Sequence, residues 1–316
     1  MQPAPLIGIP EAPVPEGGRG LWLQGKDGAR LRAALFPPQG APRGSVVLSP
    51  GRTEPIEKYV EVVGALQRRG FHVLAHDWRG QGLSVRALPE RLRGHARGYA
   101  VFLSDFSGML DQVGGELPQP WINLAHSMGG GLALLALSRG EDRFAGAVCT
   151  APMIGLYQVR AFPRAAGLIA RTAVLCGFSG AMLQTYDPFA QTFDGNILTH
   201  DRARFERYMA QLRACPDLAL GGPTWGWLDY ALSAGRVLSR PESAERVRLP
   251  FTLIGAGQDK LVLEASVRRF AEAAPQGRYV EIEEARHEIL METDQVLAAF
   301  WREFDALAER VRPPSA

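Results

Sequence analysis

The chain lacks the cysteine pattern from which disulfide frameworks and zinc sites are built. Its 316 residues contain three cysteines, Cys149, Cys176 and Cys215, with no CxxC pair and no Cys/His cluster. An odd number of cysteines at unrelated spacings argues against disulfide pairing and against a structural zinc ion. We therefore expect three buried thiols in a reducing compartment, and no metal site.

An excess of charge of one sign is also missing. The 35 Lys and Arg residues nearly balance the 33 Asp and Glu residues, which leaves a formal net charge of +2. Domains that bind nucleic acid are usually strongly basic, so we expect no nucleic-acid partner. No feature of the sequence predicts an obligate protein partner either.

Long uninterrupted apolar runs are absent. The most apolar segment, residues 165–183, contains Arg171 and three glycines, so it does not predict a membrane-spanning helix. The first residues, "MQPAPLIGIPEAPVPEGG", lack the basic region and continuous apolar stretch of a signal peptide. We expect a cytoplasmic protein, and a peripheral contact with the inner face of the membrane stays open.

What the sequence does contain is an alternation of short apolar runs with helical patterns. The runs predict strands at residues 21–23, 31–36, 45–48, 71–76, 121–125, 145–150, 250–257 and 278–282. The 3.6-residue patterns predict helices at residues 56–69, 99–113, 128–138, 263–274 and 293–310. Such alternation is typical of a mostly parallel central sheet flanked by helices, which places the chain in the α/β class.

The alternation stops after Pro152 for about eighty residues. Residues 153–236 show helical and loop patterns but no convincing strand, which predicts an inserted helical cap. We therefore expect a proline-rich N-terminal arm (1–20), a core in two pieces (21–152 and 237–316) and a cap (153–236).

The stretch "INLAHSMGGGLALLAL" places Ser127 between a predicted strand and a predicted helix. In G-x-S-x-G elbows, small flanking residues let the backbone turn sharply and expose the serine hydroxyl. Here Ala125 and Gly129 occupy the two small positions. Because serine is also a common helix N-cap, this motif alone leaves the role of Ser127 open.

Two later segments supply partners for a nucleophilic serine. Asp259 follows the strand of "IGAGQDKLV", and His287 follows the strand of "EEARHEIL". Reactive groups in open α/β sheets gather at the carboxyl ends of strands, so the three side chains are expected to meet. In such a site His287 takes the serine proton and Asp259 orients the imidazole. Glu264 is the rival for Asp259, and His287 has the alternative of a surface residue bonded to Glu283 or Glu284.

An oxyanion needs backbone N–H donors, and the sequence offers two. One is Met128, directly after the serine. The other is the amide of Arg52 in "LSPGRTEPIEKY", where Gly51 permits a close turn. The alternative for that segment is a plain strand-to-helix turn with Glu54 near the helix start. The run "DWRGQGLS" lacks the third glycine of a dinucleotide fingerprint, and we expect it to be a scaffold loop with Asp77 and Arg79 in hydrogen bonds.

These motifs together resemble the lysophospholipase and monoacylglycerol-lipase group of α/β-hydrolases (serine aminopeptidase S33-like), closest to the bacterial lysophospholipase type. The matching stretches are "SPGRTEPIEKY", "GFHVLAHDWRGQGLS", "RGHARGYAVFLSDF", "LAHSMGG", "LTHDRARFERY", "GGPTWGWL", "GAGQDKLV" and "RHEILME". The resemblance implies the α/β-hydrolase fold with a helical cap, Ser127, Asp259 and His287 as triad, and Arg52 and Met128 as oxyanion donors. It implies no metal and no organic cofactor. Two departures are Pro50-Gly51, where many relatives carry His-Gly, and Ala125 in place of glycine.

The cap is expected to carry substrate specificity. We name as candidate substrate-binding residues Phe162, Leu168, Phe178, Met182 and Trp225. The alternative is that the apolar cap residues pack onto the core and that Trp225 anchors the junction between cap and sheet. Arg160, Arg164 and Arg171 share one helical face if Pro163 is tolerated, and that face would meet a phosphate, an anionic membrane or only solvent.

The resulting hypothesis is a serine ester hydrolase that cleaves a lysophospholipid or monoacylglycerol through an acyl-enzyme intermediate. Within enzymes, the alternatives are a carboxylesterase for small non-lipid esters and an acyltransferase. A different class also stays open, namely a catalytically silent binding protein on a hydrolase scaffold. An aspartate nucleophile, as in dehalogenases and epoxide hydrolases, is disfavoured because Ser127 stands at the elbow.

Overall fold

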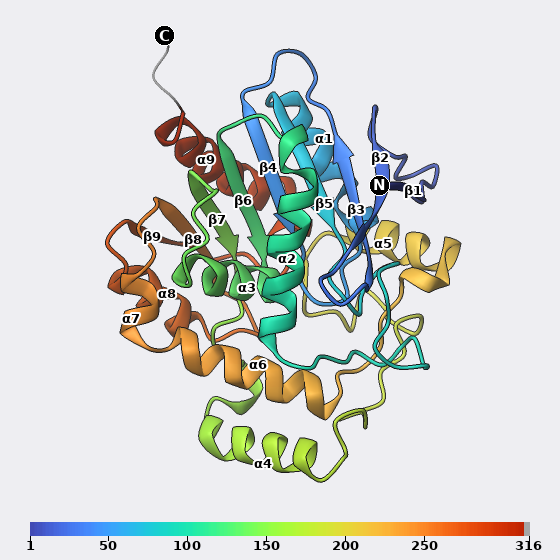
Figure 1. Cartoon of the computed structure of the whole chain (residues 1–316), viewed down its shortest axis with the longest axis vertical. Helices are drawn as coiled ribbons and strands as arrows, with labels where there is room; N and C mark the ends of the chain where they lie inside the picture. Colours follow the sequence, from blue (N-terminus) through green and yellow to red (C-terminus); the bar gives the residue numbers. More distant parts are fainter. Residues whose placement is uncertain (313–316) are drawn as a thin grey trace.

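A single nine-stranded sheet runs through the computed structural model, which describes residues 1–312 (Figure 1). The strand order is β1-β2-β3-β5-β4-β6-β7-β8-β9. The strands are β1 (Gln2–Ala4), β2 (Arg19–Gln24), β3 (Arg30–Phe36), β4 (Gly44–Ser49), β5 (Phe71–His76), β6 (Trp121–His126), β7 (Gly146–Thr150), β8 (Phe251–Ala256) and β9 (Gly277–Ile282). From β5 to β9 all neighbours are parallel, and β1, β2, β3 and β5 pair antiparallel. The predicted mostly parallel sheet is confirmed.

Helices cover both faces of the sheet because the inner strands are buried on both sides. In β4, Val46 and Leu48 join the apolar cluster beneath α1 (Val60–Arg68) and α9 (Asp294–Arg310), whereas Val47 joins the cluster beneath α2 (Tyr99–Val113) and α3 (Ser127–Ser138). Successive strand residues point to opposite faces, so one strand serves both cores. Figure 1 shows α2 and α3 on one side of the sheet and α1 and α9 on the other.

One element lies inside the predicted N-terminal arm. Strand β1 pairs with β2 and forms the sheet edge, with Pro3 opposite Leu21. A three-residue strand containing a proline gives no period-2 signal, which explains why the sequence did not reveal it.

Between β7 and β8 the described chain forms helices but no strand. They are α4 (Pro163–Leu175), α5 (Arg202–Ala214), α6 (Trp225–Leu238) and α7 (Pro241–Glu245). Helix α6 contacts α3 and α4, and its Tyr230, Ala231 and Ala234 belong to the main core. Figure 1 shows α4 as the outermost helix beyond α6, with α5 apart from both, and α5 contacts the turn at Ile56–Tyr59. The inserted segment therefore occupies two places on the core.

The three cysteines are free, as expected, but only Cys149 is buried. Cys176 is exposed and Cys215 is half-buried, so the expectation of three buried thiols is wrong for these two. The reason is that Cys176 caps the C-terminus of the outermost helix, α4. In residues 1–312 we find no helix with the length and apolar character needed to cross a membrane.

Candidate active site

Ser127 lies at a sharp turn between β6 and α3. Its φ angle of +49° lies in the left-handed region, which a residue with a Cβ atom rarely adopts. Gly129 makes the turn sterically feasible, since a Cβ there would come within 2.3 Å of the Ser49 carbonyl oxygen. An ordinary N-cap residue has extended backbone angles, and here His126 occupies that position with φ −121°. Strain of this kind is typical of functional positions.

The structure brings Ser127, His287 and Asp259 together at the carboxyl ends of the strands. The Nε2 atom of His287 lies 2.9 Å from the Ser127 Oγ atom, and its Nδ1 lies 2.6 Å from Asp259 Oδ2. The other oxygen of Asp259 accepts the N–H groups of Leu261 and Val262. With the proton on Nδ1, the imidazole is free to accept the serine proton at Nε2.

The pKa shifts of His287 and Asp259 support a proton-accepting imidazole beside an ionised carboxylate. Burial opposes the charged form of His287, but the hydrogen bond and charge of Asp259 outweigh burial and hold its pKa above the ordinary value. Burial likewise opposes ionisation of Asp259, yet the hydrogen bond to His287 keeps the pKa of this carboxyl below its ordinary value. The pair therefore stabilises an imidazolium, the species that forms when the serine loses its proton.

The rival residues are engaged elsewhere. Glu264 accepts hydrogen bonds from Tyr279 and Arg268, not from His287. His126, the residue before Ser127, turns its ring away from the serine, and its Nδ1 lies 3.0 Å from the Thr150 hydroxyl. Burial lowers the pKa of His126 to about 4, so this ring is neutral.

One predicted oxyanion donor, Met128, directly follows Ser127, and the segment before the other, Arg52, packs against the start of α3, where a Cβ on Gly129 would come within 2.4 Å of the Pro50 carbonyl oxygen. Met128 is the second residue of α3, and the first four N–H groups of a helix have no partner within the helix. The neighbouring residue of Arg52, Thr53, has a φ of +68°, and its N–H donates to Gln81 at 2.6 Å. Trp78 donates to the Pro50 carbonyl at 2.8 Å, so the "DWRGQGLS" loop holds this turn in place. In that loop Asp77 bonds Arg32 and Arg79 bonds Asp105, which confirms the predicted scaffold role.

Comparison with known families identifies the family to which the chain belongs. The family model described as serine aminopeptidase, S33, matches residues 40–294. The chain belongs to the S33 family.

Relatives of this S33 chain are found among lipid hydrolases. It is 32% identical to lysophospholipase L2 of Escherichia coli (strain K12) over 260 residues, which are 79% of this chain and 75% of that protein. It is 25% identical to monoglyceride lipase of Rattus norvegicus over 273 residues, 85% of this chain and 82% of that one. Among solved structures, a soluble variant of Saccharomyces cerevisiae monoglyceride lipase, in complex with a substrate analog, superposes with a TM-score of 0.75. That match has 19% identity and covers 98% of this chain and 100% of the other, and the chain has the α/β-hydrolase fold.

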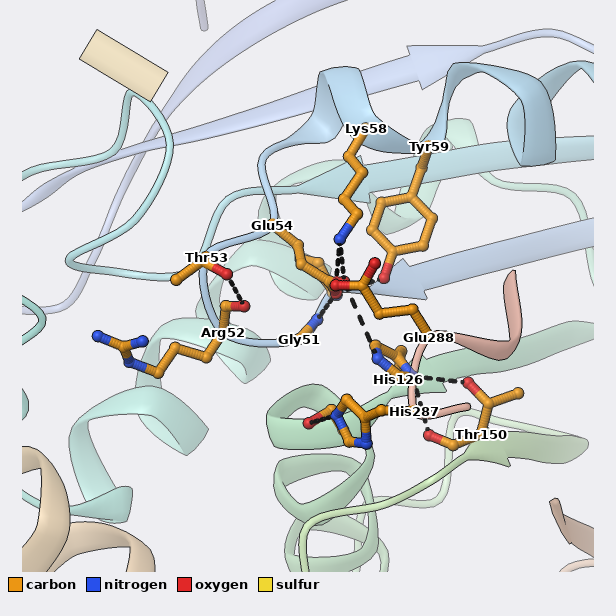
Figure 2. A network of polar contacts seen from close by, with 12 residues as sticks. Gly51, Arg52, Thr53, Glu54, Lys58, Tyr59, His126, Thr150, His287 and Glu288 are labelled. Atoms are coloured by element: carbon orange, nitrogen blue, oxygen red, sulfur yellow. Dashed lines mark hydrogen bonds and ion pairs between the residues drawn. The ribbon is translucent and has the colours of Figure 1, made fainter. Parts of the chain in front are cut away.

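The S33 site rests on a buried cluster of charges that sequence analysis missed. Lys58 lies 2.9 Å from Glu54 Oε1 and 2.5 Å from Glu288 Oε1, and all three side chains are buried (Figure 2). The second oxygen of Glu54 accepts the N–H of Gly51 at 2.5 Å and the hydroxyl of Tyr59. We call Glu54, Lys58 and Glu288 the buried charge cluster. It joins the turn before Arg52 to the residue after His287.

The cluster also contacts His287 through a second imidazole ring. The ring centres of His126 and His287 are 4.9 Å apart, and His126 Nε2 lies 3.9 Å from Glu54 Oε1 (Figure 2). Burial opposes ionisation of Glu54, but Lys58 holds the pKa of this carboxyl down to about 2. Burial raises the pKa of Glu288 above its ordinary value, although Lys58 opposes that rise. Lys58 lies close to both carboxyl groups and serves as the cation for both. The i, i+4 spacing of Glu54 and Lys58 was the available signal, and nothing local linked it to Glu288.

The candidate substrate residues are not gathered around Ser127 in this structure. Phe162, Leu168 and Phe178 lie on the outside, with exposed fractions of 76%, 69% and 60%. Helix α4 buries only Gly167 and Ala170, because small residues let it approach α6 closely. Met182 and Trp225 are half-buried where the chain enters α6, beside the bridge between Met182 and Thr224.

The expected face of three arginines does not form on one helix. Pro163 is the first residue of α4, a position that suits proline because no N–H is needed there. Arg160 therefore lies before the helix, where it stacks on Tyr157 at 3.8 Å. Arg171 pairs with Asp229 of α6 at 3.4 Å. Within residues 1–312 we find no group of three or more His, Cys, Asp or Glu side chains placed to hold a metal ion.

Proposed function

We propose that the chain is a serine ester hydrolase that cleaves single-chain acyl lipids, a lysophospholipid or a monoacylglycerol, through an acyl-enzyme intermediate. The observation that carries the proposal is the continuous hydrogen-bonded series from Ser127 Oγ through His287 to Asp259. Residues of these types in this geometry activate a hydroxyl that is otherwise a poor nucleophile at neutral pH. The names of the relatives, lysophospholipase L2 and monoglyceride lipase, support the substrate class.

In the first half of the reaction, Ser127 Oγ attacks the ester carbonyl carbon and its proton passes to His287 Nε2. The N–H groups of Arg52 and Met128 stabilise the oxyanion. Collapse of the tetrahedral intermediate breaks the bond to the glycerol oxygen, which takes the proton from His287. A water then gives its proton to His287 and attacks the acyl group, and Ser127 is regenerated as the fatty acid leaves.

A substrate series tests this function. We expect kcat/KM on acyl glycerols and lysophospholipids to rise with chain length from acetyl to palmitoyl, since each buried CH₂ contributes about 0.8 kcal/mol. Release of free fatty acid is the measurement. Highest activity on acetyl and butyryl esters would indicate a carboxylesterase instead. Esters formed with an added alcohol would indicate an acyltransferase, and no turnover at all would favour a silent binding protein.

We further propose that residues 153–236 form the cap and that α4 makes the contact with lipid. Its outer face carries large apolar side chains, including Leu168 and Leu175 at 69% and 72% exposure. From Phe144 to Tyr186 the sequence contains no Asp or Glu, while it contains three arginines. An apolar face flanked by cations is typical of helices that lie in the surface of an anionic membrane. The exposed free Cys176 is compatible with a reducing cytoplasm, so we place the contact at the inner face of the membrane.

Vesicle binding tests the membrane contact. We expect Leu168→Ser combined with Leu175→Ser to weaken binding to phosphatidylglycerol vesicles at least about tenfold, because two apolar side chains no longer enter the lipid. Sedimentation of vesicles with bound protein measures this. The matched control is Leu92→Ser with Ile197→Ser, two apolar residues with 39% and 38% exposure outside α4. Equal losses in both double variants, or no loss in the α4 variant, would contradict the assignment.

A further inference from the structure

The side chain of Arg52 has no role in the mechanism described above, which uses only its backbone N–H. It extends away from the buried charge cluster (Figure 2) and reaches the segment that leads into α6. There its Nη2 donates to the Gly221 carbonyl, and the guanidinium lies 5.2 Å from the ring centre of Trp227. Gly94 leaves room for it, because a Cβ at that position would come within 2.3 Å of Nη2.

This guanidinium lacks the counter-ions that other buried cations have. Arg32 binds Glu57 and Asp77, and Lys58 binds Glu54 and Glu288. For Arg52 the structure of residues 1–312 provides no carboxylate within ion-pair distance, and its buried Nε has no hydrogen-bond partner. Burial lowers its pKa to about 10, with only the hydroxyls of tyrosines nearby.

A second half-buried arginine, Arg86, also lacks a carboxylate partner and has an unpartnered Nε, but its terminal nitrogens have more carbonyl partners than those of Arg52. Arg86 donates to the carbonyl oxygens of Gly80, Gly82, Asp217 and Ala219. Arg52 has one such carbonyl partner. Because a buried charge is costly unless it is paired, an anionic ligand at Arg52 would be strongly favoured.

The position of the Arg52 guanidinium indicates which part of a substrate it would bind. It belongs to the residue whose N–H is proposed to bind the ester oxygen, so an anion bound to the guanidinium would lie within the length of one arginine side chain from the scissile ester. In a lysophospholipid, the three-carbon glycerol unit separates the ester from the phosphate by such a distance. A neutral monoacylglycerol has only a hydroxyl at that point.

A small cavity lies between Met128, a predicted oxyanion donor, and two residues that the Arg52 guanidinium contacts, Gly94 and Trp227. Its volume is about 10 Å³, and its walls include Met128, Gly94 and Trp227. Such a volume holds about one water molecule, so a head group requires the walls of the cavity to move apart. A phosphate oxygen bound to Arg52 Nη2 would replace its contact with the Gly221 carbonyl.

We propose, on the basis of the function proposed above, that the Arg52 guanidinium binds the phosphate of a single-chain phospholipid and makes the enzyme prefer lysophospholipids to neutral monoacylglycerols. The two substrates share the same ester chemistry at Ser127. The preference therefore arises from the head group alone.

The experiment compares 1-palmitoyl-lysophosphatidylglycerol with 1-palmitoylglycerol, which differ only beyond the glycerol carbon that carries the head group. For Arg52→Gln we expect the ratio of the two kcat/KM values to fall by about 10- to 100-fold, the loss of a charge-assisted hydrogen-bonded pair. For Arg52→Lys, which keeps the charge, we expect a smaller fall. The matched control is Arg86→Gln, which removes another half-buried arginine bonded to carbonyls of the same region and should leave the ratio unchanged.

Each outcome decides between the site and its alternatives. Equal loss on both substrates in Arg52→Gln would show that the side chain only ties the turn to α6, and would overturn the proposal. Retention of the ratio in Arg52→Gln would overturn it as well. Inhibition of palmitoylglycerol hydrolysis by inorganic phosphate, without any preference between the lipids, would reveal a site for free phosphate and reject the lipid. Failure of the wild type to hydrolyse either lipid would instead reject the proposed function, and thermal unfolding of each variant identifies any that fails to fold.

Discussion

Ser127→Ala is expected to lower kcat by about six orders of magnitude and to abolish labelling by a fluorophosphonate. The loss is large because His287 and Asp259 have no hydroxyl to activate once Oγ is removed. The fold should be retained, since alanine keeps the Cβ atom that serine already holds at a φ of +49°. Intact-mass analysis after labelling, together with fatty-acid release, measures both effects.

The matched control for this variant lies on the same helix. Ser138 is also buried, and its hydroxyl donates to the Leu135 carbonyl at the end of α3. We expect Ser138→Ala to keep full labelling and nearly full turnover. Persistent labelling of Ser127→Ala at one site would place the nucleophile elsewhere and refute its assignment.

Lys58→Met is expected to lower the free energy of unfolding by about 3–5 kcal/mol. The substitution leaves the Glu54 carboxylate buried with no cation, while Glu288 loses its hydrogen-bond donor. The turn before Arg52 depends on Glu54, which accepts the Gly51 N–H, so turnover should fall as well. Urea denaturation followed by circular dichroism measures the stability.

A triple variant separates the loss of charge pairing from the loss of side-chain packing. In Glu54→Gln/Lys58→Met/Glu288→Gln no charge remains, and the amide oxygen of residue 54 can still accept from Gly51. We expect this variant to recover most of the stability lost in Lys58→Met, since removing all the charges avoids an unpaired one. Wild-type stability of Lys58→Met would contradict the picture of a cluster that needs its cation.

Most of the sheet could be predicted because its strands are short, apolar and separated by helices with a clear period. The strand at residues 71–76 and the helix at 99–113 match β5 and α2 residue for residue. The weakest prediction concerned the inserted segment. Its apolar residues were expected to bind substrate or, as the alternative, to pack onto the core. In the structure Gly167 and Ala170 take the inner face of α4, and period alone does not say which face of a helix has a partner.

The site also contains residues that the sequence predicted and residues that it did not. Ser127, Asp259 and His287 were found because each follows a strand, and parallel strands bring their carboxyl ends to one edge. The buried charge cluster was not found, because Glu288 and Lys58 are 230 positions apart and meet only in the folded chain. The side chain of Arg52 was likewise invisible, since its lack of a counter-ion is a property of the tertiary surroundings.

The adjacency of β7 and β8 has a consequence for how this enzyme can change. Cys149 and Leu253 are partners in the sheet although the whole segment 151–250 lies between the two strands. The entropy cost of closing a loop rises only with the logarithm of its length. Insertions or deletions in the outer part of that segment, such as α4, therefore cost the sheet little, while Ser127 stays on one side of the junction and Asp259 and His287 on the other. The edge of the sheet that carries Ser127, Asp259 and His287 can therefore stay the same while the inserted segment changes in sequence and length to suit a new substrate.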